Sequence, residues 1–248
     1  MITLEELTTK WRNNPQEPVR VIALGSSNTE LHWHSLGHFN WFSWLSSSMR
    51  EWVGRHVSTI NQGINGETAE DLIKRIDRDV LSFLPKAVIV TIGGNDANLK
   101  YTVDQYRHNL LTIINIIQDA DILPILQTYY CPIYEKMPLH FRIFHKYVEV
   151  NRNIASKKDI PLIDQYKYFL PLYENDPEAY SKLMLDGLHV NPLGNSIMGI
   201  IACRYFSLPD PTFMDRSFRK EVRRHLNLIY KYIGFLPRIK IKKKFKTF

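Results

Sequence analysis

The segment from Asp186 to His189 holds the residue pair with the clearest chemistry in this chain. A carboxylate three residues before a histidine, inside one short loop, can hold one imidazole nitrogen and orient the ring. The other nitrogen is then free to accept a proton from a nucleophile. Asn191 and Pro192 follow directly and indicate a helix start, because proline suits the first turn of a helix. This segment predicts a general base together with the acid that orients it.

A candidate nucleophile, Ser27, follows an apolar segment and Gly25 near the beginning of the chain. We expect Gly25 to allow a tight turn and Ser27 to lie at the start of the next helix, where backbone N–H groups point outward. A serine placed there can attack a carbonyl carbon beside amides that hold the resulting oxyanion. Serine is also a common helix N-cap, so this turn alone leaves both interpretations open.

Two further turns carry residues that suit oxyanion binding. Gly63 and Gly66 allow the backbone to approach a ligand, and Gly66 can donate its N–H, although a plain helix start capped by Asn65 explains the same residues. In the turn Gly93–Asp96, Asn95 can offer its side-chain NH₂ group to a developing oxyanion. Glycine, asparagine and aspartate also form turns for purely structural reasons.

The elements around these turns alternate between strand and helix. Short β-branched runs predict five buried strands, at Val19–Leu24, Val57–Asn61, Ala87–Ile92, Ile122–Gln127 and Pro161–Ile163. Residues with helical period lie between and after them, at Thr68–Leu84, Val103–Ile117, Phe141–Ser156, Leu193–Phe206 and Asp215–Tyr232. Such alternation predicts a parallel sheet with helices on its faces, and a ligand site beyond the carboxyl ends of its strands. The three turns follow the first three strands, as that rule requires.

Four sequence blocks, in this order, resemble the SGNH hydrolase family, also called GDSL-like. They are Gly25-Ser26-Ser27, Asn61–Thr68, Gly93–Asp96 and Asp186–His189, within a resemblance that spans about Val19 to Phe206. The family pattern is Gly-Asp-Ser after the first strand, Gly after the second, Gly-x-Asn-Asp after the third and Asp-x-x-His near the end. The resemblance implies a flavodoxin-like three-layer α/β/α sandwich with a five-stranded parallel sheet, and no metal or other cofactor.

The resemblance also implies a role for each matching residue. Ser27 is the expected nucleophile, His189 the general base and Asp186 its orienting acid. The expected oxyanion hole consists of the Ser27 N–H, the Gly66 N–H and the Asn95 side chain. One position departs from the pattern, because Ser26 stands where the family has aspartate. That aspartate supports the turn in relatives, so we expect Ser26 to alter local hydrogen bonding and to leave catalysis in place.

Aromatic residues near these turns are candidates for substrate binding. The segment Leu31–Trp44 follows the nucleophile and is rich in tryptophan and histidine, which suit an acyl pocket or a sugar ring. We expect Asn28, Trp33 and Tyr129 to contact substrate, while a connection that packs its aromatic side chains on the core is the simpler alternative. The His32-x-His34 spacing suggests a metal, but no carboxylate or cysteine cluster accompanies it, so we predict none.

The chain has 248 residues and a net charge of +7, and that charge is unevenly distributed. Residues 235–248 contain six basic and no acidic residues, and residues 215–231 are also basic, whereas the rest of the chain is slightly acidic. We therefore expect a hydrolase domain over 1–213 and a basic helical appendage and tail over 214–248. The mixture of basic and apolar residues in the tail fits contact with an anionic membrane surface or polymer, and it equally fits a solvated chain end without a partner. An acidic body without a nucleic-acid motif argues against nucleic acid.

No apolar segment reaches the about 18 residues that a transmembrane helix needs. The polar N-terminal residues 1–20 do not resemble a signal peptide, so we expect a cytoplasmic protein, with peripheral membrane contact through the tail. The function predicted is a serine esterase or acylhydrolase that cleaves a small acyl group, such as acetyl, from a carbohydrate or lipid. The alternatives are an acyltransferase on the same fold and a non-catalytic binding domain.

Overall fold

A computed structural model describes residues 2–31, 33–211 and 214–234, with Trp33 placed by its backbone alone. Its centre is one parallel sheet with the strand order β2-β1-β3-β4-β5. The strands are β1 (Val19–Gly25), β2 (Val57–Gly63), β3 (Ala87–Thr91), β4 (Leu123–Gln127) and β5 (Leu162–Ile163). Each lies within about two residues of its predicted bounds, and the predicted five-stranded parallel α/β fold is confirmed.

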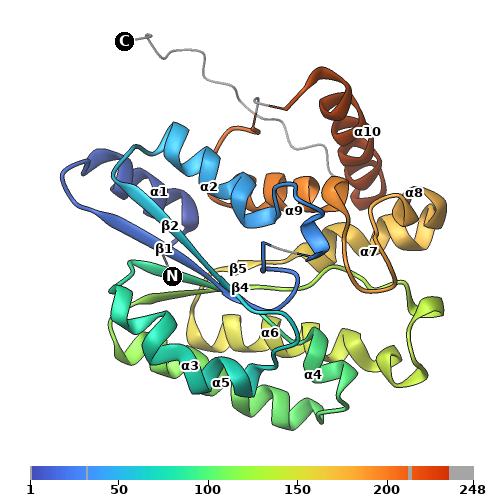
Figure 1. Cartoon of the computed structure of the whole chain (residues 1–248), viewed down its shortest axis with the longest axis horizontal. Coiled ribbons are helices and arrows are strands. Elements are labelled where there is room, and N and C mark those ends of the chain that lie inside the picture. Colours follow the sequence, from blue (N-terminus) through green and yellow to red (C-terminus); the bar gives the residue numbers. More distant parts are fainter. Residues whose placement is uncertain (1, 32, 212–213, 235–248) are drawn as a thin grey trace.

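Helices cover both faces of the sheet and make a three-layer sandwich (Figure 1). Helices α3, α5 and α6 lie on one face, and α2 and α9 pack against each other on the opposite face. The α-helices are α1 (Leu4–Asn13), α2 (Trp41–Trp52), α3 (Ala69–Asp79), α4 (Gly94–Asn98), α5 (Val103–Asp119), α6 (Phe144–Lys158), α7 (Gln165–Asn175), α8 (Pro177–Ser181), α9 (Pro192–Tyr205) and α10 (Arg216–Ile233). Short 3₁₀ segments are η1 (Trp33–Ser35), η2 (Leu81–Phe83), η3 (Tyr134–Lys136) and η4 (Leu139–Ile143).

Local capping explains where two of these helices begin. Helix α9 starts as predicted, with Pro192 in its first turn and the Asn191 side chain accepting hydrogen bonds from the next N–H groups. The cap of α3 is Thr68 and not Asn65, because Thr68 and Asp71 satisfy each other's backbone N–H groups in a capping box. Asn65 therefore lies in the loop, and the interpretation of this turn as an Asn65-capped helix start is wrong.

The segment after Ser27 differs from the sequence-based expectation. Ser27 lies in a hydrogen-bonded turn, and the next α-helix, α2, begins only at Trp41, with Asn40 as its cap. The Asn40 side chain also donates to the Thr29 carbonyl at 2.5 Å and so ties the start of α2 to the turn. The aromatic residues of α2 are largely buried, which agrees with the expectation that part of this segment packs on the core.

Helix α10 packs on α7 and α9 through an apolar stripe that includes Val222, Leu226 and Ile229. The predicted boundary between a hydrolase domain and an appendage stays a prediction, and the basic tail, residues 235–248, lies outside the described residues. Among the helices that the structure describes, none combines the length and apolar character needed to cross a bilayer.

Candidate active site

The carboxyl ends of three neighbouring strands bring the predicted blocks to one edge of the sheet. Gly25, at the end of β1, pairs with Gly63 of β2 on one side and with Thr91 of β3 on the other. The turn that carries Ser27, the loop after β2 and the loop after β3 therefore leave the sheet side by side. This is the edge at which α/β sheets bind ligands.

The turn after β1 is tight enough to require glycine at position 25. A Cβ atom there would lie 2.5 Å from the Thr91 carbonyl oxygen and 2.4 Å from the Thr29 hydroxyl oxygen, which no side chain tolerates. The Thr29 and Glu30 N–H groups both donate to the Ser26 carbonyl, at 2.8 and 2.9 Å, and close the turn around Ser27. The sequence after β1 thus holds Ser27 in a rigid backbone.

Ser27, His189 and Asp186 form one chain of hydrogen bonds. The Ser27 hydroxyl oxygen lies 3.0 Å from His189 Nε2, and His189 Nδ1 lies 2.8 Å from Asp186 Oδ2. A carboxylate only accepts hydrogen bonds, so Nδ1 carries the imidazole proton and Nε2 is left to accept the serine proton. The arrangement is that of a nucleophile, a base and an orienting acid.

The loop Asp186–His189 holds its own carboxylate in the ionised form. Asp186 Oδ1 accepts hydrogen bonds from the N–H groups of Leu188 and His189, at 2.6 and 2.7 Å. Partial burial acts to raise the pKa of Asp186, but the His189 imidazole and these two N–H groups outweigh it and keep the pKa well below its usual range. Asp186 is therefore charged at neutral pH and remains an acceptor for Nδ1.

Gly66, in the loop after β2, and Asn95, in the first turn of α4, lie in segments that are bonded to each other and to the Ser27 turn. The Asn95 side-chain NH₂ donates to the Glu67 carbonyl at 2.8 Å, next to Gly66, whose φ of 84° suits glycine. On the other side, the Asn61 side chain donates to the Thr29 carbonyl at 2.7 Å. The three predicted oxyanion donors thus come from three connected segments: the Ser27 turn, the loop after β2 and the start of α4.

Asp96, beside Asn95, has a structural task within the same segments. Its side chain is fully buried and accepts the Ala69 N–H at the start of α3, with its two oxygens at 3.0 and 3.2 Å. Burial raises the pKa of Asp96 to about 6, although the Ala69 N–H acts in the opposite direction. Asp96 therefore fastens α4, the short helix after β3, to the start of α3.

Two of the residues expected to contact substrate lie beneath the Ser27 turn. Tyr129 is buried and shares a hydrogen bond of 2.9 Å with the hydroxyl of Ser26, the residue that replaces the family's aspartate. Asn28 is also buried, and its Oδ1 accepts the Tyr130 hydroxyl at 2.6 Å. Both residues support the turn, and direct contact with substrate stays a prediction for them. The side chain of Trp33 lies outside the described part of the chain.

Two contacts with the catalytic loop, made by His34 and Tyr130, were not predicted from the sequence. His34 stacks on His189 with ring centroids 3.6 Å apart and the planes inclined by 13°. The Tyr130 hydroxyl accepts the Val190 N–H at 3.0 Å and lies within hydrogen-bond distance of the Leu188 carbonyl, so it joins the His189 loop to Asn28. No local pattern marks either contact, because the partners are distant along the chain.

The stack on His189 also gives His34 a role other than metal binding. Burial and the neighbouring His189 ring lower the pKa of His34, against the opposing effect of Asp186 and Glu30, so its ring is neutral at neutral pH. Within the described ranges, no three His, Cys, Asp or Glu side chains are grouped in a way that would hold a metal ion.

A serine–histidine–aspartate chain at the carboxyl edge of a doubly covered parallel sheet defines the class as a serine hydrolase of α/β architecture. The sequence profile of the GDSL-like Lipase/Acylhydrolase family matches residues 23–197, and the chain belongs to this family. The protein is thus a serine esterase with the SGNH hydrolase fold.

Named relatives are similar at low identity. The uncharacterized lipoprotein YqeF of Bacillus subtilis is 26% identical over 202 residues, which cover 71% of this chain and 81% of YqeF. Thioesterase 1/protease 1/lysophospholipase L1 of Escherichia coli is 22% identical over 154 residues, covering 60% and 66% of the two chains.

Two solved structures show the same fold. Axe2, an acetylxylan esterase from Geobacillus stearothermophilus, has a TM-score of 0.67 and 19% identity, and the match covers 79% of this chain and 97% of Axe2. The acetyl xylan esterase AlAXEase has a TM-score of 0.64 and 24% identity, and the match covers 75% and 98%. Both are matched almost completely, whereas about a fifth of the present chain lies outside the Axe2 match.

Proposed function

We propose that this esterase releases a small acyl group, acetyl among them, from a carbohydrate or lipid ester through an acyl-serine intermediate. The observation that carries the proposal is the hydrogen-bonded chain from Ser27 through His189 to Asp186, with distances of 3.0 and 2.8 Å. Each member has the hydrogen-bonding capacity that its role needs, because Asp186 is ionised and leaves Nε2 of His189 as the acceptor.

The reaction has two halves. His189 removes the Ser27 proton as the hydroxyl oxygen attacks the ester carbonyl, and the same proton then passes to the departing alcohol oxygen. The acyl group stays on Ser27 until His189 activates a water molecule that releases it as the acid. In both halves the oxyanion is held by the N–H groups of Ser27 and Gly66 and by the Asn95 side chain, and each such donor contributes about 10²–10³ in rate.

The names of similar proteins support this range of substrates. Axe2 and AlAXEase are named for acetylated xylan, whereas the Escherichia coli relative is named as a thioesterase and lysophospholipase. Carbohydrate esters and lipid esters are thus both represented among proteins that share the fold, and the acyl group in the carbohydrate cases is small.

The contact with an anionic surface expected for residues 235–248 stays a prediction, and the basic face of α10 is a second candidate for such a contact. Five side chains on this face line a groove of about 1050 Å³, namely Arg216, Arg219, Lys220, Arg223 and Arg224. Anionic lipid headgroups attract such clusters by about 1 kcal/mol per basic residue near the surface. Co-sedimentation with anionic and with neutral vesicles tests the contact, which we expect only with the anionic ones and only at low salt.

The cytoplasmic location expected from the sequence stays a prediction. The relative YqeF is named a lipoprotein, so a membrane location is the alternative to test. Fractionation of the source cells, followed by detection of this chain in the soluble and membrane fractions, decides between them.

Hydrolysis of p-nitrophenyl acetate by matched variants tests the proposed chemistry. We expect activity in the wild type that is lost in Ser27→Ala and in His189→Ala. Ser26→Ala is the matched control, because it removes a neighbouring hydroxyl that bonds Tyr129 and not His189, and we expect it to keep at least a tenth of the activity. Activity that survives in Ser27→Ala contradicts the assignment of the nucleophile. Acyl transfer to a sugar acceptor with no hydrolysis indicates the acyltransferase instead.

A further inference from the structure

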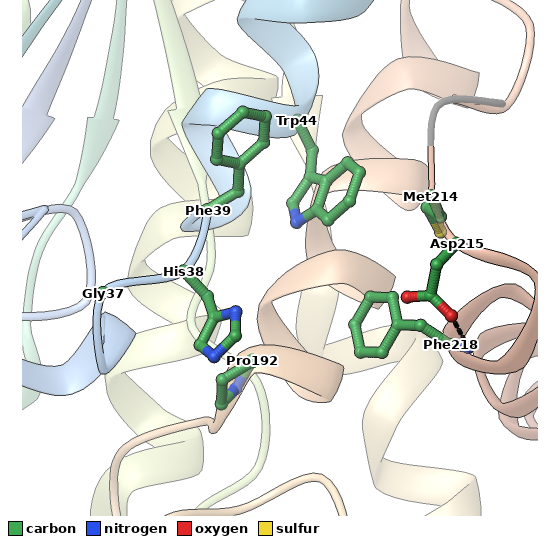
Figure 2. A pocket seen from close by; sticks show the side chains of 8 residues that line it. All are labelled: Gly37, His38, Phe39, Trp44, Pro192, Met214, Asp215 and Phe218. Atoms are coloured by element: carbon green, nitrogen blue, oxygen red, sulfur yellow. Dashed lines mark hydrogen bonds between the residues drawn. The ribbon is translucent and has the colours of Figure 1, made fainter.

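A pocket of about 410 Å³ opens between the segment after η1, helix α2, the start of α9 and the start of α10 (Figure 2). Its volume falls in the range of small-molecule sites, about 300–1,000 Å³. It is lined by residues 37–39, Trp44, Pro192, Met214, Asp215 and Phe218.

Two of the lining residues lie only three positions along the chain from His189 or from the histidine that stacks on it. Pro192 is three residues from His189, so their Cα atoms are at most about 11 Å apart. Gly37 is likewise three residues from His34, whose ring stacks on His189. The loop that carries Gly66 and the helix that carries Asn95 supply none of the lining residues.

This closeness to His189 bears on which part of the ester the pocket can receive. During acylation, His189 gives its proton to the departing alcohol oxygen, so that oxygen must lie next to Nε2. The alcohol part of the substrate therefore extends on the histidine side. We propose that this pocket is the subsite for the alcohol part of the ester and that it takes a carbohydrate ring; this inference rests on the proposed esterase function.

The apolar walls suit the C–H faces of a sugar ring. Phe39 meets Trp44 edge-on at 5.3 Å between ring centroids, and Trp44 lies nearly parallel to Phe218 at 6.3 Å. Figure 2 shows the three rings around one space, with His38 beside Pro192 at its edge. Aromatic rings with a few fixed polar groups are the usual composition of small-ligand sites.

Asp215 favours a polyhydroxylated ligand over a fatty chain. Its Oδ1 caps α10 by accepting the N–H groups of Ser217 and Phe218, at 2.9 and 3.0 Å, while its other oxygen is turned toward the pocket (Figure 2). The Ser217 hydroxyl and the Phe218 N–H lower the pKa of Asp215, so it is charged at neutral pH. Sugar hydroxyls can donate to this carboxylate, whereas a hydrocarbon chain would desolvate it without a partner.

The subsite also belongs to a part of the chain outside the family match. Met214, Asp215 and Phe218 all lie beyond residue 197, where that match ends. The shared domain thus supplies the reacting groups, and the segment around the start of α10 completes the wall that selects the alcohol.

The test compares two acetate esters that differ in the alcohol. The probes are an acetylated methyl xyloside and ethyl acetate, with released acetate as the readout. The variants are Asp215→Asn, which keeps a good N-cap, and Phe39→Ala, which changes an exposed side chain. The matched controls are Asp176→Asn, which alters the N-cap of α8, and Phe83→Ala, an exposed ring on η2.

We expect the ratio of kcat/KM for the sugar ester to kcat/KM for ethyl acetate to fall about tenfold or more in both pocket variants, because a hydrogen bond to a charged group and an aromatic contact are lost. The controls are expected to keep the wild-type ratio within about twofold. An unchanged ratio in both pocket variants overturns the proposal. Selective loss on p-nitrophenyl octanoate instead of the sugar ester also overturns it, because it assigns the pocket to the acyl chain.

A binding measurement separates failure of the subsite from failure of the esterase. Saturation-transfer NMR with methyl xyloside and the Ser27→Ala protein reports occupancy of the pocket without turnover. One outcome is that methyl xyloside binds, that Asp215→Asn weakens this binding at least fivefold, and that the wild type hydrolyses neither ester. That outcome supports the subsite and contradicts the esterase function. No binding to Ser27→Ala, combined with normal hydrolysis of ethyl acetate by the wild type, rejects the subsite and retains the esterase.

Discussion

Replacing Asp186 by asparagine separates the two tasks of this carboxylate. In the wild type the N–H groups of Leu188 and His189 lie 2.6 and 2.7 Å from Asp186 Oδ1. The amide oxygen of asparagine can still accept both, so the loop keeps its shape. The amide nitrogen then takes the place of Oδ2, which lies 2.8 Å from His189 Nδ1 in the wild type. Two hydrogen-bond donors cannot share that contact. The imidazole proton moves to Nε2, which faces the Ser27 hydroxyl and can no longer accept its proton.

The expected cost falls on turnover rather than on folding. A base held in the wrong tautomer costs about 10³–10⁴ in kcat, which corresponds to about 4–5.5 kcal/mol of transition-state stabilisation. Asp186→Ala, in contrast, also removes the acceptor of two backbone N–H groups. Each lost hydrogen bond costs about 1 kcal/mol, so we expect the melting temperature of the alanine variant to drop by about 4–8 °C and that of the asparagine variant to stay within about 3 °C.

The assay is p-nitrophenyl acetate hydrolysis with both variants, together with thermal unfolding followed by circular dichroism. Asp186→Asn with more than a tenth of the wild-type kcat refutes the argument, because the proton on Nδ1 would then not depend on the carboxylate. Equal melting temperatures for Asp186→Asn and Asp186→Ala refute the structural half, because the two N–H contacts would then contribute nothing to the loop.

Three further predictions concern the residues around the triad. We expect His34→Ala to lower kcat about 2- to 12-fold, because the ring contact with His189 contributes about 0.5–1.5 kcal/mol, and His34→Phe to restore most of the lost activity. A kcat of His34→Ala equal to that of the wild type contradicts this prediction. Tyr130→Phe leaves the Val190 N–H without its acceptor, so we expect the free energy of unfolding to fall by about 1–3 kcal/mol in urea titrations. Asp96 binds a proton more tightly in the folded protein, so its contribution to stability is greatest below pH 4 and is lost as the pH rises through about 6. In urea titrations from pH 4 to 8, we expect the free energy of unfolding of the wild type to fall by up to about 3 kcal/mol relative to that of Asp96→Asn. Parallel pH dependence of the two proteins contradicts this prediction.

The strands and the chemical residues of this protein could be predicted from local sequence. A buried strand needs only a short β-branched run, and a turn needs glycine, asparagine or aspartate, so five strands and the turns after them are marked by adjacent residues. The Asp186–His189 pair is equally local, because its hydrogen bond spans three residues. Helix α2 was less visible, since its aromatic residues fit a packed connection as well as a helix capped by Asn40.

The tertiary structure alone decided which distant residues meet. Ser27 reaches His189 across 162 positions, His34 stacks on the same ring, and Asp215 joins the segment after η1 around one pocket. These contacts depend on the side-by-side order of β2, β1 and β3 and on the packing of α9 and α10, which no local pattern encodes. Residue types and their spacing therefore determined the chemistry available to this chain. The partner of each group depended on how the sheet and its helices pack together, because long-range contacts form only when the chain folds as a unit.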